Sequence, residues 1–136
     1  MTPNRMLPHT FSKDLHHTKI VTAIHEAESK TSGQIRLLIS PKHVEDAVAT
    51  AQKEFVRLGM DKSPARNGVL IFVAPRARKF AVIGDQAVHA LCGDEFWRLL
   101  AGAMSDYFRQ GDFSAGIAHG VEKAGDLLAQ HFPRKI

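Results

Sequence analysis

Four polar side chains stand out as candidates for chemistry, and each lies beside an apolar run. Ser32 supplies a hydroxyl, Arg66 a guanidinium, Asn67 an amide and Asp85 a carboxylate. If folding brings them together, the set could bind a partner or ligand, and Asp85 could coordinate a hard cation such as Ca²⁺. The same residue types also serve as turn and helix-cap residues, so a purely structural role is the alternative.

A second pattern involves Asp85, His89 and Cys92, which are spaced at i, i+4 and i+7. On a helix these residues would share one face and could offer three metal ligands. His89 and Cys92 could also form a base and its nucleophile. The sequence offers no fourth ligand and no orienting group, however, and a buried cysteine usually packs as a small apolar side chain.

A third candidate is the basic turn formed by Arg76, Arg78 and Lys79, which joins two apolar runs. Three cationic side chains in one turn would favour an anion. Charged residues at hairpin tips also protect sheet edges from pairing with other chains, which is the structural alternative. The chain has no Gly-rich phosphate loop, HExxH or GxSxG motif.

The elements that must position these residues follow from the hydrophobic pattern. We predict strands at 34–39, 68–74 and 79–83, with a helix at 47–58. The strand–helix–strand unit implies a right-handed parallel crossover, and the short PRAR connection implies an antiparallel hairpin. The predicted fold is therefore a single-domain α/β sandwich with a small mixed sheet flanked by helices.

This topology predicts where the polar residues lie. The start of the first strand, the start of the second and the end of the third would share one end of the sheet. Ser32, Arg66, Asn67 and Asp85 would converge there, and the basic turn would lie at the opposite end.

Helices are also expected on both sides of this unit. Ser12 could cap the first helix, and Asp112 or Ser114 could cap the last one. We expect an N-terminal arm at 1–11, one α/β domain at 12–132 and a C-terminal tail at 133–136.

Composition limits the function classes. The 136 residues carry 18 Lys and Arg against 14 Asp and Glu, a net charge of +4, and the basic residues are spread out rather than clustered in a stripe. We therefore expect no specific binding to nucleic acid. A single cysteine, no secretory signal and no apolar run of membrane-spanning length indicate a soluble, cytoplasmic protein.

Three segments resemble the TPM domain family: TSGQIRLLIS, RNGVLIFVAPRARKFAVIGD and FRQGDFSAGIAHGVEKAG. The resemblance runs from about Ser12 to Phe132 and implies an α/β sandwich. Acid phosphatase activity and calcium binding have been attributed to a plant member, so the resemblance also brings phosphate-ester hydrolysis and Ca²⁺ into consideration. Arg66 stands where the family often has Asp, and Gly84-Asp85-Gln86-Ala87 replaces the usual Gly-Tyr-Gly-acidic motif.

We therefore expect a non-catalytic TPM-type module that binds a protein partner at the end of the sheet bearing Ser32, Arg66, Asn67 and Asp85. The alternative is a metal-assisted phosphatase in which Asp85 holds a cation or acts as an acid and Arg66 clamps the phosphate. The sequence leaves the partner, the substrate and the oligomeric state open.

Overall fold

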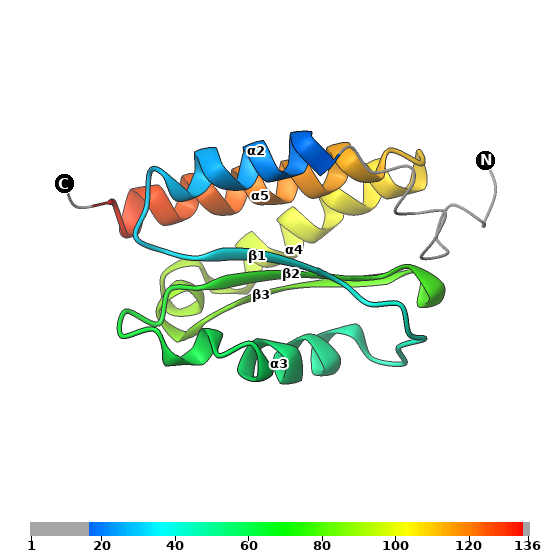
Figure 1. The fold of residues 1–136 in the computed structure, drawn as a ribbon, viewed down its shortest axis with the longest axis horizontal. Coiled ribbons are helices and arrows are strands. Elements are labelled where there is room, and N and C mark those ends of the chain that lie inside the picture. Colours follow the sequence, from blue (N-terminus) through cyan, green and yellow to red (C-terminus); the bar gives the residue numbers. More distant parts are fainter. Residues whose placement is uncertain (1–16, 135–136) are drawn as a thin grey trace.

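The computed structural model describes residues 17–134 and shows three layers (Figure 1). A three-stranded sheet lies between helix α3 on one face and helices α2, α4 and α5 on the other. The elements in chain order are α2 (His17–Glu28), β1 (Ile35–Ile39), α3 (Ala47–Arg57), the 3-10 turn η2 (Met60–Lys62), β2 (Val69–Ala74), the 3-10 turn η3 (Pro75–Ala77), β3 (Lys79–Gly84), α4 (Gln86–Arg109) and α5 (Phe113–His131).

The sheet has the order β1-β2-β3 and confirms the predicted mixed topology. β1 runs parallel to β2, with Ile35 opposite Val69. β2 runs antiparallel to β3, with Val69 opposite Gly84. The starts of β1 and β2 and the end of β3 therefore lie at one end of the sheet.

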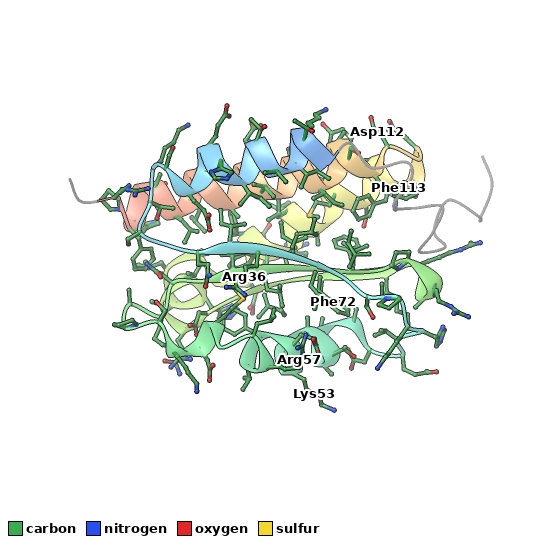
Figure 2. The ribbon with its side chains drawn as sticks, viewed as in Figure 1. Arg36, Lys53, Arg57, Phe72, Asp112 and Phe113 are labelled. Atoms are coloured by element: carbon green, nitrogen blue, oxygen red, sulfur yellow. The ribbon has the colours of Figure 1, made fainter. Side chains whose placement is uncertain are left out.

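Strand β2 is buried on both faces, as its uninterrupted apolar sequence predicts. Because side chains alternate along a strand, Val69, Ile71 and Val73 pack under α2, α4 and α5. Leu70 and Phe72 point the other way and pack against α3, and Figure 2 shows Phe72 between the sheet and that helix. One strand thus supplies side chains to both apolar cores.

Helices α3, α4 and α5 begin at the aspartate caps Asp46, Asp85 and Asp112. Asp46 accepts a hydrogen bond from the Ala49 amide at 3.0 Å, and Asp112 accepts one from the Ala115 amide at 3.2 Å. Asp112, which Figure 2 places at the start of α5, is therefore the cap of this helix, and Ser114 lies inside its first turn. These bonds satisfy amides that the helix itself leaves without a partner.

Several local features were not predicted from the sequence. The turn between β2 and β3 contains η3 and ends at Arg78 in the left-handed conformation, with φ of 55°. The loop after α3 contains η2, which follows Gly59 with φ of 75°. Helix α4 is broken at Gly93, whose φ of 72° and ψ of 176° are not helical.

Some predictions fall outside the described residues. The arm at 1–11, the proposed cap at Ser12 and residues 135–136 of the tail belong to this group. Between residues 17 and 134, none of the helices combines the length and the apolar character that crossing a bilayer requires.

Candidate functional site

Arg66 and Asp85 form a bidentate ion pair at the end of the sheet. The Nε and Nη2 atoms of Arg66 lie 3.1 and 2.8 Å from Asp85 Oδ1, and Nε lies 2.9 Å from Oδ2. The antiparallel pairing of β2 and β3 brings the two residues together, because the Asp85 amide donates to the Gly68 carbonyl at 2.9 Å. The Asp85 side chain is only 3% exposed, whereas that of Arg66 is 37% exposed.

Asp85 also caps α4. Its Oδ1 accepts a hydrogen bond from the Gln86 amide at 2.7 Å, at the helix end where a negative charge is favourable. Arg66 has a left-handed backbone with φ of 50°, and its carbonyl accepts from the Ala87 amide at 3.1 Å. The hydrogen bonds to Asp85 raise the pKa of the Arg66 guanidinium above its ordinary value. Both oxygens of Asp85 are thus engaged inside the protein.

Ser32 and Asn67 form a separate pair beside the first one. Asn67 Nδ2 donates to Ser32 Oγ at 3.2 Å, and Ser63 Oγ donates to Asn67 Oδ1 at 3.4 Å. Asn67 is only 2% exposed, so its side chain is buried between Ser32 and the Arg66–Asp85 pair. The four candidates therefore share one end of the sheet, but Ser32 lines one hollow, Arg66 and Asp85 line another, and Asn67 lines neither.

The hollow beside Ser32 has a volume of about 450 Å³ and includes Glu28, Thr31 and Arg134. The cleft beside Arg66 and Asp85, about 460 Å³, lies between α3 and the start of α4. The end of α3 and the start of α4 both lie towards the left end of the sheet in Figure 1. We call this second hollow the α3–α4 cleft; its lining includes Phe55, Val56, Asp61, Arg66, Ile83 and Asp85.

Asp61 is a cleft residue that the sequence analysis missed. Its Oδ1 atom is buried and has no hydrogen-bond partner among residues 17–134. The signal was present in the topology, because the loop from α3 to β2 must end where Arg66 lies. Nothing in the spacing of residues, however, distinguished this aspartate from an ordinary loop residue.

A family model described as the TPM domain matches residues 8–127. The chain belongs to the TPM domain family. Its fold also matches that of the BA42 protein from the psychrophilic bacterium Bizionia argentinensis, solved by NMR. That comparison gives a TM-score of 0.79 and 38% identity, and covers 89% of this chain and 86% of BA42. Among curated proteins, none matches this sequence.

The metal set considered at Asp85, His89 and Cys92 is not assembled in this TPM domain. His89 Nε2 lies 3.2 Å from Asp94 Oδ1, and the Cys92 thiol donates to the Val88 carbonyl at 2.9 Å. Within the described part of the chain, no three His, Cys, Asp or Glu residues are grouped so that they could hold a metal ion. A calcium-binding role for Asp85 alone stays a prediction, and it would require Arg66 to move away.

A nucleophilic role for Cys92 also lacks support in the geometry of the TPM domain. Burial raises the pKa of the Cys92 thiol, which disfavours the reactive thiolate. Within residues 17–134, Cys92 and His89 are not joined by a hydrogen bond. Cys92 donates to the Val88 carbonyl instead, and His89 lies beside Asp94.

The basic turn lies at the opposite end of the sheet, as predicted from the topology. Arg76, Arg78 and Lys79 are all exposed, and Lys79 also donates a hydrogen bond to the Glu45 carbonyl in the loop before α3. Lys79 thus fixes the hairpin to that loop. An anion site formed by Arg76, Arg78 and Lys79 stays a prediction.

Proposed function

We propose that this TPM domain is a non-catalytic module that binds a protein partner at the α3–α4 cleft. The observation that carries the proposal is the state of Asp85, whose two oxygens are both held by Arg66 and whose Oδ1 also caps α4. A general acid or base needs a free carboxyl oxygen within reach of the substrate. Asp85 offers none unless the ion pair opens.

Arg66 retains donors for a partner even though it is paired. Its Nε and Nη2 atoms bond to Asp85, while Nη1 makes no hydrogen bond to any residue in 17–134. The bidentate pairing fixes the plane of the guanidinium before a partner arrives, so little side-chain entropy is lost on binding. A partly exposed, preorganised arginine beside a cleft is a recognised type of anchor at protein interfaces.

The competing function is phosphate-ester hydrolysis, and the presence of a guanidinium in the cleft is the observation that favours it. Arginine binds phosphate oxygens through two parallel hydrogen bonds. In this scheme Arg66 would exchange Asp85 for the phosphate, and Asp85 would then hold a cation or donate a proton.

A phosphatase screen with and without Ca²⁺ and Mg²⁺ separates the two functions. We expect no turnover by the wild-type protein and no metal-induced shift in melting temperature, because a ligand that binds the folded state raises that temperature. Turnover that Asp85→Asn abolishes would overturn the binding module in favour of the hydrolase.

Affinity capture with a double variant tests the surface directly. Arg66→Ala with Asp85→Ala should stay folded and lose partners that the wild-type protein retains. The matched control is Arg57→Ala with Glu54→Ala, which removes another arginine–carboxylate pair of α3 that does not line the α3–α4 cleft. Equal recovery of the partner by both double variants would exclude the α3–α4 cleft.

A further inference from the structure

We propose that the free edge of strand β1 pairs with an extended segment of a partner protein that carries an acidic residue between apolar ones. This surface is separate from the α3–α4 cleft and goes beyond the function proposed above. Three observations carry it: main-chain groups of β1 that face away from the sheet, a hollow where α3 leaves β1 uncovered, and cationic side chains beside the same edge.

The free main-chain groups follow from the pairing of β1 with β2. Ile39 lies opposite Val73, and the Ser40 amide donates to the Val73 carbonyl at 2.8 Å. Because alternate residues of a strand direct their amide and carbonyl to one side, those of Leu37 and Ile39 face away from β2. Among residues 17–134, these two amides have no hydrogen-bond partner. An edge of this kind can accept one more strand.

The free edge is short and closed at both ends. The Ile35 amide also faces outwards, but Glu28 Oε2 accepts its hydrogen bond at 2.8 Å. At the other end lies Pro41, which is exposed and has no amide to donate. A partner can therefore pair with β1 only over a few residues centred on Leu37.

A hollow lies beside this edge because α3 packs beneath β2 and β3 and leaves β1 largely uncovered. Its volume is about 530 Å³, and its lining includes Leu38 of β1, Phe72 of β2 and Arg57 of α3. We call it the β1–α3 groove. Leu38 is only partly buried there, and Leu37 is partly buried on the opposite face of the strand. A strand added at the edge would cover both leucines with its own side chains.

Arg36 gives the edge its charge. It lies on the same face of β1 as Leu38 and is exposed, and Figure 2 shows it on the strand above α3. Its Nε and Nη2 atoms lie 3.0 and 3.1 Å from the uncharged side-chain amide of Gln34, and it makes no ion pair with a carboxylate of the described chain. A charged residue on an edge strand discourages pairing, except with a strand that carries the opposite charge at that position.

The charges within the β1–α3 groove do not neutralise this arginine. The hydrogen bond from Arg57, together with the charges of Arg57 and Lys42, lowers the pKa of the Glu54 carboxyl, so that one carboxylate serves two cations. The other carboxylate of the lining, Glu45, lies 3.7 Å from His43. An acidic side chain of the partner would therefore meet favourable charge along this face of β1.

Titration of the ¹⁵N-labelled protein with three peptides tests the proposal. The first is acetyl-Val-Glu-Val-Thr-Val-amide, which places its valines on one face and its glutamate on the other. The second has lysine in place of glutamate, and the third is the glutamate peptide with its peptide nitrogens methylated, which removes its main-chain donors. We expect the first peptide alone to shift the amide signals of Leu37 and Ile39.

A charge reversal identifies the side chain that selects the peptide. Arg36→Glu should weaken the glutamate peptide by about three- to tenfold, as expected when an attractive cross-strand pair becomes repulsive, and should favour the lysine peptide. The matched control is Arg98→Glu on α4, which lies across the sheet from α3 and should leave the affinity unchanged. Arg66→Ala with Asp85→Ala should also leave it unchanged, which separates this surface from the α3–α4 cleft.

Three results would overturn the proposal. Equal binding of the methylated peptide would show that the main chain of β1 is not the recognition element. Equal binding of the lysine peptide, or unchanged affinity in Arg36→Glu, would show that no acidic residue is selected. Broadening of the Leu37 and Ile39 signals that depends on protein concentration alone would assign the edge to a second copy of this chain.

Discussion

Gly84 contacts Trp97, and replacing it by alanine should destabilise the protein, whereas the same replacement at Gly102 should stabilise it. A Cβ atom added at Gly84 would lie 2.5 Å from Trp97 Cζ2 and 2.9 Å from Cη2, so the indole ring must move. Overpacking of this kind costs about 1–3 kcal/mol. Part of this cost is offset, because alanine loses less conformational entropy than glycine when the chain folds, a gain of about 0.5–1 kcal/mol.

We therefore expect Gly84→Ala to lower the free energy of unfolding by about 1–2 kcal/mol, which corresponds to a fall in melting temperature of roughly 3–8 °C for a domain of this size. Trp97 is the only tryptophan of the chain, so its fluorescence reports on the contact itself. The emission should shift to longer wavelength as the half-buried ring moves towards water.

Gly102→Ala is the matched control in the same helix as Trp97. A Cβ at Gly102 would have no neighbour within 4 Å, and the residue is exposed. Alanine should therefore stabilise the helix by up to about 1 kcal/mol. The reasoning is refuted if Gly84→Ala unfolds at or above the wild-type temperature, or if it unfolds earlier with unchanged Trp97 emission.

Three other predictions concern the caps, the core and the cysteine. Asp112→Ala should lower stability by about 1 kcal/mol in urea titrations, whereas Asp112→Asn should be nearly neutral because asparagine also caps helices; equal losses would contradict the capping role. Phe72→Ala should cost about 3–5 kcal/mol, because Phe72 is 1% exposed, and a loss below 1 kcal/mol would contradict its place in the core beside α3. Because burial raises the pKa of Cys92, iodoacetamide should modify it more slowly at neutral pH than it modifies a small-molecule thiol, and the rate should rise only at higher pH; a rate equal to that of the free thiol would contradict the buried setting.

The sequence predicted the sheet and the meeting of Arg66 with Asp85 because both depend on local patterns. The apolar run of β2 and the short connection to β3 are sufficient to specify a hairpin, and a hairpin places its two ends side by side. The closeness of Arg66 and Asp85 followed from that pairing, whereas their bidentate ion pair is a finding of the structure.

The parts that the sequence did not predict depend on contacts between distant elements. Asp61 becomes a cleft residue because η2 packs against α3, a contact between elements that the spacing of residues does not specify. Ser32 and Arg66 open onto different hollows because Asn67 is buried between them, which a strand pattern does not specify. The break at Gly93 left no periodic signal, because apolar residues continue on both sides of it.

Since the two apolar cores draw on alternate side chains of the single strand β2, neither half of the molecule can come apart while the other stays intact. The protein should therefore melt in one cooperative step, with matching transitions by circular dichroism and fluorescence. In hydrogen-exchange experiments the amides from Val69 to Val73 should be the last to acquire deuterium, and they should do so together.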